Sequence, residues 1–368
     1  MIDQRLLAPL TQGQIFKGAI VHPELFLWDA WSYQEQETLH LYCLAISRTK
    51  PDGEPLLPAE KDNYPFHIRH FSSLDLGASW KDEGCFQQSG NAIDGHDARN
   101  IWSGSIAALP GGAKIAGFTG IFEIDDTRRY LQNISLGLSA DGYSVGSVLP
   151  SPLSCPLRDR EQILGLGYYL DGPDTLGSND GEEGGPVMAW RDPFIFVDSD
   201  NHIHAFWAAK TGPCVGVVAH GLIKDGLIAG GDSGYSLETL YPPMSLPDGE
   251  KFTQAELPKV YCDDSTGTCY LIVSSCNRIF EGQPDSEVDK TIRLYKSASL
   301  RGPWQIAAGD NSAIKGSEGL FGMTVLQTDF ANNRMLCISP RTGTVDPAEA
   351  FTIGETFYLD LATASIKR

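Results

Sequence analysis

Three acidic residues stand where a carboxylate could do chemistry. Asp29 lies in LFLWDAW between two tryptophans, Asp192 lies in AWRDPF, and Glu256 lies in TQAELPKVY ahead of an apolar run. Two carboxylates on either side of a glycosidic bond are the usual apparatus for cleaving it. Each acid could instead face solvent in a turn or cap a strand. Three acids in such similar contexts favour the reactive interpretation.

The neighbouring side chains suit a sugar ligand. Trp28, Trp31 and Trp102 offer flat apolar faces that can stack on a sugar ring, although a tryptophan also packs well in a core. Arg191 directly precedes Asp192 and is expected to lower the pKa of that acid and keep it ionised. These residue types together predict a pocket for a carbohydrate.

Three other motifs indicate no further site. His202 and His204 alternate on one strand and could hold a metal ion, but imidazoles that face solvent are the simpler interpretation. The acidic loop SNDGEEGG (178–185) lacks the spacing of an EF-hand, so it predicts a solvated loop rather than a calcium site. Asn133-Ile134-Ser135 is a glycosylation sequon, which matters only in an exported chain. The sequence predicts neither a metal nor an organic cofactor.

The segments around these residues are short and β-rich. Runs such as TLHLYCLAIS (38–47), FIFVDSDNHIHAFWAA (194–209) and KVYCDDSTGTCYLIVSS (259–275) are separated by glycine and proline. The turns DSDN and DDSTG inside the last two predict hairpins. Long amphipathic helical patterns are scarce, so the chain is expected to be all-β.

An internal repeat indicates how the strands are arranged. IRHFSSLDLGASW (68–80), ISLGLSADGYS (134–144) and IRLYKSASLRGPW (292–304) each combine an alternating strand, a serine and a turn with glycine. The spacing of the first two copies fits a unit of four strands. Five such units, repeated about an axis, give a five-bladed β-propeller that occupies residues 1–368 as one domain. A β-sandwich with unrelated hairpins is the alternative.

Composition and charge narrow the class of partner. Hydrophobic residues make up 42% of the 368 residues and charged residues 20%, which is typical of a globular chain. The net charge of −19 disfavours nucleic acid and anionic membrane surfaces, so a small neutral ligand is expected. No apolar run is long enough to span a membrane. The opening MIDQRLLAPLTQGQ does not resemble a secretory signal, so a cytoplasmic location is expected.

The eight cysteines show no C-x-x-C pair, which argues against a zinc site of that type. Cys262 and Cys269 flank a turn and could face each other across two strands. In a chain without an export signal, free thiols are the favoured interpretation.

Four motifs resemble those of a known family. LWDAW (27–31), IWSGS (101–105), WRDPF (190–194) and AELPKVY (255–261) are similar in order and approximate spacing to motifs of glycoside hydrolase family 68, the levansucrases and bacterial β-fructofuranosidases. The likeness runs from about Phe26 to Leu361. R-D-P occurs in several five-bladed sugar-cleaving families, whereas W-D-x-W with W-S-G-S is much more specific. The resemblance implies a single-domain five-bladed propeller with a funnel-shaped central pocket.

The resemblance also implies roles for individual residues. Asp29 matches the nucleophile, Asp192 the stabiliser of the transition state, and Glu256 the general acid and base. Positions around the two sugars are matched by Trp28, Trp102, Ser103, Arg191 and Arg278.

Two positions depart from the family pattern. Gln254 stands where the family has an acid, and Leu257 where it has an arginine; Gln254 is kept as a candidate substrate-binding residue. The expected function is retaining hydrolysis of terminal β-fructofuranosides such as sucrose through a covalent fructosyl-enzyme, without a cofactor. A fructosyltransferase, a furanosidase for another sugar and a non-catalytic sugar-binding propeller are the alternatives.

Overall fold

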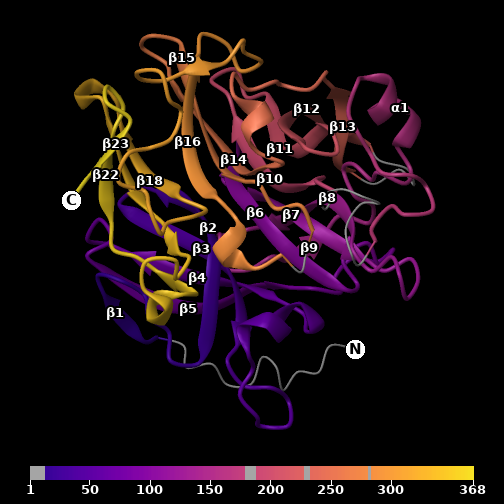
Figure 1. Cartoon of the computed structure of the whole chain (residues 1–368), viewed down its shortest axis with the longest axis horizontal. Coiled ribbons are helices and arrows are strands. Elements are labelled where there is room, and N and C mark those ends of the chain that lie inside the picture. The colour runs from indigo at the N-terminus through magenta and orange to yellow at the C-terminus, as the bar shows by residue number, and fades with distance from the viewer. Residues whose placement is uncertain (1–12, 179–187, 228–232, 281–282) are drawn as a thin grey trace.

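Five antiparallel sheets of four or five strands surround a central axis in the computed structural model, which describes residues 13–178, 188–227, 233–280 and 283–368 (Figure 1). The expectation of a five-bladed β-propeller is confirmed. Among the described residues, no helix combines the length and the apolar character needed to cross a membrane.

Each blade is built from consecutive strands, with its first strand, apart from the edge strand β1, nearest the axis. Blade one contains β2 (Leu25–Glu35), β3 (Thr38–Ser47), β4 (His67–Ser73), β5 (Ser79–Gln88) and, at its outer edge, β1 (Ile15–Lys17). Blade two contains β6 (Asn100–Ala108), β7 (Lys114–Phe122), β8 (Leu131–Ser139) and β9 (Ser147–Val148). Blade three contains β10 (Arg191–Val197), β11 (Ile203–Gly212), β12 (Val215–Leu227) and β13 (Ser233–Leu240).

The last two blades follow the same plan. Blade four contains β14 (Gln254–Asp263), β15 (Thr268–Cys276), β16 (Lys290–Ser297) and β17 (Gln305–Ile306). Blade five contains β18 (Thr324–Asp329), β19 (Arg334–Ile338), β22 (Phe357–Asp360) and β23 (Ser365–Lys367), and the small pair β20 (Pro340–Arg341) and β21 (Thr352–Ile353) lies between β19 and β22 in the chain. The helical segments are short: α1 (Arg160–Gly165), η2 (Pro58–Asn63), η3 (Gly249–Lys251), η4 (Asp285–Glu287), η5 (Phe330–Asn332) and η6 (Pro347–Glu349).

The hydrophobic core is divided among the interfaces between blades. Each cluster of buried apolar side chains in the described residues joins two neighbouring blades, and the clusters follow one another around the ring. Trp190 and Trp207 of blade three, for example, pack with Ile134 and Leu136 of blade two. Because every face of a blade is covered by the next one, the sheets must close into a ring to bury their apolar residues.

Blade one and blade five close that ring by packing against each other, and neither blade contributes a strand to the sheet of the other. Ser32 on β2 donates a hydrogen bond from Oγ to the carbonyl of Val325 on β18 over 2.7 Å. The amide of Leu27 donates to the carbonyl of Phe351 over 3.0 Å. These bonds supplement the apolar cluster that joins the two blades, which includes Trp80 and Ile338.

The repeat found in the sequence corresponds to one element of the blade. Its three copies fall on the third strand and the turn toward the fourth strand, at β4–β5, β8–β9 and β16–β17. The turns DSDN and DDSTG lie between β10 and β11 and between β14 and β15, so both expected hairpins are present.

Several smaller expectations are corrected. Cys262 and Cys269 are bonded to each other as a disulfide rather than free, because β14 and β15 pair them directly across the hairpin. Trp31 packs against Tyr42 in the core between blades one and two, so it offers no face to a ligand. Asn133 of the sequon is buried in β8. Most of the acidic loop 178–185 lies outside the described residues.

Candidate active site

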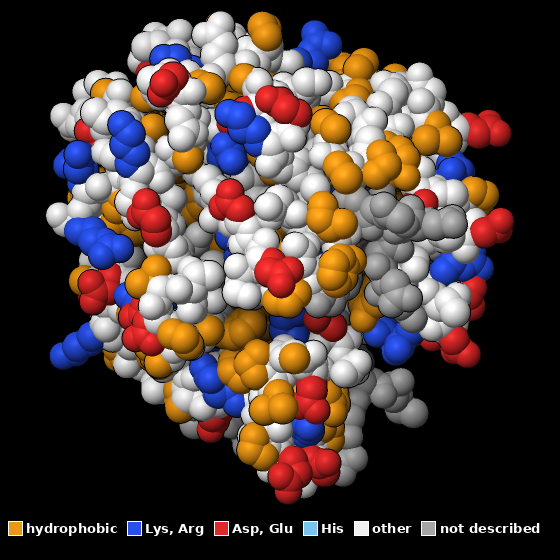
Figure 2. Space-filling view, viewed as in Figure 1, with side chains coloured by type: hydrophobic (Ala, Val, Ile, Leu, Met, Phe, Trp, Pro, Cys, Tyr) orange, Lys and Arg blue, Asp and Glu red, His pale blue; other side chains and the backbone are white. Residues whose placement is uncertain are grey.

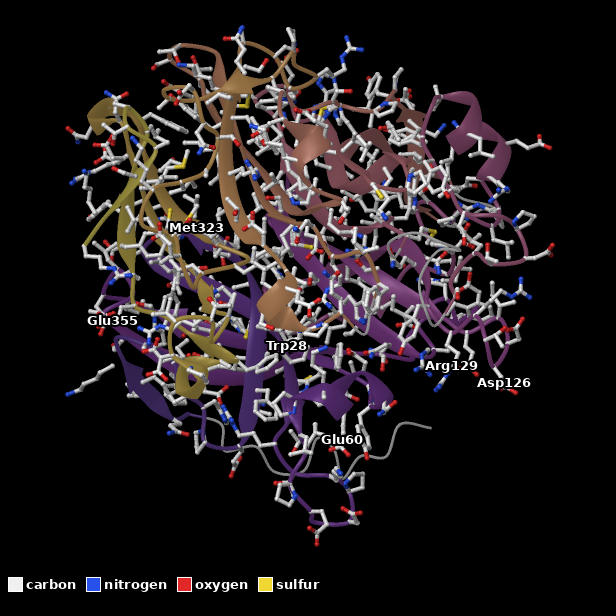
Figure 3. The ribbon with its side chains drawn as sticks, in the orientation of Figure 1. Trp28, Glu60, Asp126, Arg129, Met323 and Glu355 are labelled. Carbon is white, nitrogen blue, oxygen red and sulfur yellow. A yellow bond between two sulfur atoms is a disulfide. The ribbon has the colours of Figure 1, made fainter. Side chains whose placement is uncertain are left out.

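A pocket of about 390 Å³ lies where the innermost strands of blades one to four begin. All nine residues proposed from the sequence line it: Trp28, Asp29, Trp102, Ser103, Arg191, Asp192, Gln254, Glu256 and Arg278. The remaining lining residues are Leu44, Lys61, Asp62, Phe66, Tyr130 and Ser178. Trp28 lies near the middle of the molecule when it is viewed down its shortest axis (Figure 3).

The order of strands within a blade decides which segments reach this pocket. The innermost strand starts at the pocket, so in an antiparallel sheet the second strand ends there and the third begins there. The connections β3–β4, β7–β8 and β15–β16 therefore meet at the rim, where they place Lys61, Tyr130 and Arg278.

The innermost strands are interrupted at the level of the acids. The register between first and second strands shifts at Trp28/Ala30, at Trp102/Gly104, at Arg191/Phe194 and at Glu256/Lys259. A bulge of this kind re-aims a side chain that regular pleating would direct into a neighbouring blade. Asp29 and Asp192 have backbone φ angles of 39° and 61°, in the left-handed region that non-glycine residues rarely occupy. Such strained backbone is typical of functional sites.

Asp29 is held by the strand of the next blade. Ser103 Oγ donates a hydrogen bond to Asp29 Oδ2 over 2.6 Å. Burial raises the pKa of Asp29 above its ordinary value, and the bond from Ser103 acts in the opposite sense. The carboxylate is thus fixed in one orientation at the surface of the pocket.

Individual residues of the segment Trp102-Ser103-Gly104-Ser105 have identifiable structural roles. Gly104 is required because a Cβ at this position would lie 1.9 Å from the carbonyl oxygen of Gly117. Ser105 Oγ donates to the carbonyl of Pro193 over 2.9 Å and accepts from the amide of Ile195 over 2.7 Å. The motif therefore fixes Asp29 on one side and the strand that carries Asp192 on the other.

Asp192 is almost fully buried, and the structure corrects the expected effect of Arg191. Burial raises the pKa of Asp192 well above its ordinary value, and the opposing influence of Arg191 is too small to reverse this. Glu256 and Asp29, both carboxylates, raise it further. The amide of Leu257 donates to Asp192 Oδ2 over 3.2 Å, so the bulge of blade four also positions this acid.

Arg191 connects the acids of two blades. One guanidinium nitrogen, Nη2, donates to Glu256 Oε1 over 3.0 Å and to Gln254 Oε1 over 3.1 Å. Nε lies 3.8 Å from Asp192 Oδ2, and Nη1 donates to the carbonyl of Met188 over 2.7 Å. Gln254 therefore lines the pocket and also helps to position Glu256, because both side chains accept a hydrogen bond from the same nitrogen of Arg191.

Aromatic rings form the wall of the pocket. The rings of Trp28 and Phe66 meet edge to face with centroids 4.8 Å apart, and Lys61 Nζ lies 5.9 Å from each ring. Trp102 and Tyr130 form a second pair with centroids 6.0 Å apart. Flat apolar faces beside carboxylates suit the alternating apolar and hydroxylated surfaces of a sugar ring.

Lys259 is the main residue that sequence reasoning missed. It is fully buried on β14, where its ammonium group donates to the carbonyl of Leu257 over 3.4 Å. Burial lowers the pKa of Lys259 to about 8, while Asp29 and Asp192 raise it. The same charge lowers the pKa of Asp29. Its place three residues after Glu256 is the one signal in the sequence that could have indicated a role.

The two departures from the family pattern differ in position, because Gln254 lines the pocket and Leu257 does not. Leu257 adopts a φ angle of 50°, is 3% exposed and does not line the pocket. Arg278 lines the rim, where its Nη1 donates to the carbonyl of Gln283 over 2.8 Å. The rim residues Lys61, Asp62, Phe66 and Tyr130 lie in connections without a repeated pattern, so no signal in the sequence singled them out.

Comparisons with known proteins support the fold. No protein-family model and no curated protein matches the sequence. Among solved structures, a Bacillus subtilis levansucrase variant in complex with oligosaccharides has a TM-score of 0.59 at 14% identity, over 99% of this chain and 90% of the other. A B. megaterium levansucrase variant has a TM-score of 0.60 at 14% identity, over 99% and 91%.

A third structure widens the comparison. A thermostable family-43 glycoside hydrolase has a TM-score of 0.58 at 12% identity and covers 96% of both chains. The chain therefore has the five-bladed β-propeller fold of the levansucrases, and its fold is also similar to that of the family-43 hydrolase.

Proposed function

We propose that this protein is a retaining glycoside hydrolase that releases fructose from terminal β-fructofuranosides such as sucrose. One observation carries the proposal: Asp29, Asp192 and Glu256 come from three different blades and line one pocket with aromatic walls. A pocket of about 390 Å³ is in the range of small-molecule sites. The fold shared with levansucrases supports fructose as the sugar.

The proposed reaction has two steps. Asp29 attacks the anomeric carbon of the fructosyl unit while Glu256 protonates the oxygen of the leaving sugar, so the glycosidic bond breaks as the ester forms. Glu256, now a carboxylate, takes a proton from water, and the hydroxide displaces Asp29 and releases fructose. Asp192 binds the ring hydroxyls and stabilises the positive charge of the transition state. A separation of ~5–5.5 Å between the Asp29 and Glu256 carboxyls is expected.

Arg191 sets the orientation of the acid and base. Because its guanidinium donates to Glu256 Oε1, the transferable proton is carried by Oε2. Ser103 has the corresponding effect on Asp29, because its hydroxyl donates a hydrogen bond to Oδ2 and leaves Oδ1 to attack.

A second candidate is an inverting furanosidase that acts on another pentose or hexose furanoside. It is favoured by Gln254 and Leu257, which replace two residues of the levansucrase pattern, and by the equally similar fold of a family-43 hydrolase. In that case Asp29 activates water instead of attacking the sugar.

The test is product analysis with sucrose in the presence of methanol. Wild type is expected to release glucose, fructose and methyl β-fructofuranoside, because only a covalent intermediate can pass fructose to methanol with retention. Asp29→Asn and Glu256→Gln are expected to lose at least about 10²-fold in kcat. Asp264→Asn, an exposed acid in the β14–β15 turn, is the matched control and keeps full activity.

The outcomes separate the candidates. Glucose in excess of fructose, with fructose oligomers among the products, identifies a fructosyltransferase. Release from another furanoside with inversion supports the second candidate. A wild type that binds sugars but cleaves none of them, or an Asp29→Asn variant as active as wild type, contradicts both.

A further inference from the structure

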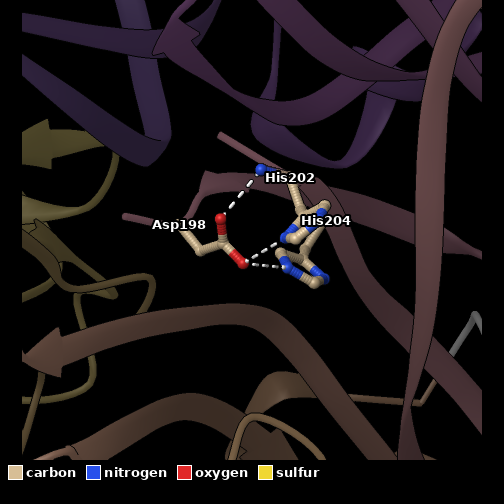
Figure 4. A group of neighbouring side chains, drawn as sticks. All are labelled: Asp198, His202 and His204. Carbon is tan, nitrogen blue, oxygen red and sulfur yellow. Dashed lines mark hydrogen bonds and ion pairs between the residues drawn. The ribbon is translucent and has the colours of Figure 1, made fainter. Parts of the chain in front are cut away.

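Three potential metal ligands meet at the β10–β11 hairpin, away from the pocket. Asp198 follows β10, His202 precedes β11, and His204 lies within β11. Their donor atoms all lie within 4.8 Å of one another. Figure 4 shows both imidazoles directed at the carboxylate of Asp198.

The carboxylate of Asp198 is fixed by the turn. Its Oδ1 accepts hydrogen bonds from the amides of Asp200 and His202 over 2.9 and 2.8 Å. Its other oxygen, Oδ2, faces His202 Nδ1 at 3.0 Å and His204 Nε2 at 3.2 Å. One oxygen of Asp198 therefore stabilises the turn. The second oxygen and the two imidazole nitrogens lie close together and could bind one ion.

His204 is prepared as a ligand by a residue behind it. The structure places His204 at 8% exposure, so the expectation of an imidazole that faces solvent is wrong for this residue, whereas the His202 side chain is 59% exposed. His204 Nδ1 lies 3.0 Å from Nε2 of the buried His220. A metal-bound histidine normally donates its second N–H to a carboxylate, a backbone carbonyl or a water, which fixes the tautomer and the ring orientation, and the ring nitrogen of His220 lies where such an acceptor would be.

The donor set and its spacing select the class of ion. Two imidazoles and one carboxylate favour Zn²⁺ over Ca²⁺ or Mg²⁺, which prefer oxygen ligands. With bonds of ~2.0–2.1 Å, tetrahedral ligands lie about 3.4 Å apart. The separations of 3.0 and 3.2 Å between Asp198 Oδ2 and the two histidines are close to this value, and the two imidazole nitrogens lie within 4.8 Å of each other. The exposed side, at His202, is open to a water as the fourth ligand.

We propose that Asp198, His202 and His204 form a Zn²⁺ site that cross-links β10 and β11. Asp198 lies six residues after Asp192 along the chain, or about 20 Å along an extended strand. The ion is therefore structural rather than catalytic: it ties together the far end of the hairpin whose near end carries Arg191 and Asp192. The proposal is independent of the proposed sugar chemistry.

The test is a metal titration of the full chain after dialysis against a chelator. Co²⁺ is expected to give the visible absorption of a four-coordinate site, and Zn²⁺ is expected to abolish it at one equivalent. Calorimetry with Zn²⁺ then gives the affinity. His202→Ala, which changes an exposed side chain, is expected to weaken Zn²⁺ binding at least about tenfold. Asp200→Asn in the same turn is the control and binds as wild type does.

A second readout guards against binding elsewhere on the chain. Zn²⁺ is expected to raise the melting temperature of wild type and of Cys214→Ser, which lacks the exposed free thiol, but not that of His202→Ala. The proposal is overturned if Zn²⁺ does not bind, or if it binds His202→Ala as tightly as wild type.

Discussion

Lys259 and the two aspartates beside it form one electrostatic unit. Asp29 and Asp192 both raise the pKa of Lys259, and Lys259 lowers the pKa of Asp29. A buried charge is tolerated where opposite charges compensate it. The lysine therefore favours the ionised form of the proposed nucleophile, against the effect of burial.

Replacement of Lys259 by Met is expected to shift the acid limb of the kcat/KM profile to higher pH. Without the ammonium charge the ionised form of Asp29 is less favoured, so its pKa rises and activity is lost at a higher pH. The measurement is the rate of glucose release from sucrose between pH 4 and 8.

Lys114→Met is the matched control, because Lys114 is also buried but pairs with Glu35 at the other end of its blade interface. It is expected to lower stability and leave the acid limb in place. A uniform loss of activity in Lys259→Met, with no change in the position of the limb, would show that Lys259 only supports packing.

Residue types and their neighbours were enough to propose nine of the fifteen residues that line the pocket, but not its electrostatics. Trp28, Ser103 and Arg278 could be proposed because they stand in or beside recognisable motifs. The raised pKa of Asp192 could not, since it depends on burial by blades that are distant in sequence. Lys259 was missed for the same reason: a lysine in a strand normally faces solvent.

At the scale of elements, the β14–β15 hairpin carries both Glu256 and the Cys262–Cys269 disulfide. The bond joins residues that already pair across the two strands. It closes a short loop at the end of the hairpin opposite the pocket, so it constrains the unfolded chain more than it shapes the site.

The double variant Cys262→Ser/Cys269→Ser is expected to lower the free energy of unfolding by about 2 kcal/mol, measured by urea denaturation. Cys214→Ser, at an exposed free cysteine, is the control and is expected to unfold as wild type does. Alkylation under denaturing, non-reducing conditions should label the six other cysteines. Labelling of all eight would rule the disulfide out.

The hairpins themselves follow from local sequence, but the bulges do not. Turns such as DSDN have a composition that specifies them locally. The register shifts at Asp29, Ser103 and Asp192 arise because each innermost strand must both pair with its neighbour and direct a polar residue at the axis. That demand comes from the ring and is invisible within one strand.

At the scale of the whole molecule, the repeat of third strand and turn predicted five blades but left a β-sandwich as the alternative, and the four family-like motifs favoured the propeller. The sequence did not indicate that β1 would add to blade one or that β20 and β21 would form a separate pair. Both pairings involve short segments of two or three residues, namely β1, β20 and β21, which carry no pattern of their own.

The net charge of −19 acts on the molecule as a whole. Acidic and basic side chains are interspersed on the face seen in Figure 2, so the excess of negative charge is not confined to one patch there. Charges of one sign repel one another in the compact state more than in the unfolded chain. Salt screens this repulsion, with a Debye length of about 30 Å at 0.01 M and about 8 Å at 0.15 M.

The melting temperature, measured by scanning calorimetry, is therefore expected to rise by roughly a few degrees when NaCl is increased from 10 to 150 mM. Choline chloride at equal ionic strength separates screening from specific binding of sodium and should give the same rise. A fall with salt would mean that exposed ion pairs, such as the one between Arg334 and Asp329, outweigh the repulsion.

The meeting of connections at the pocket rim has an evolutionary consequence. The reactive acids belong to strands tied into ladders and cores, whereas Lys61 and Tyr130 belong to connections that can change in length and sequence at little thermodynamic expense. A lineage under selection for a new sugar would accumulate its substitutions between β3 and β4 and between β7 and β8. The sequences of the strands would then still show the common origin long after the connections had diverged.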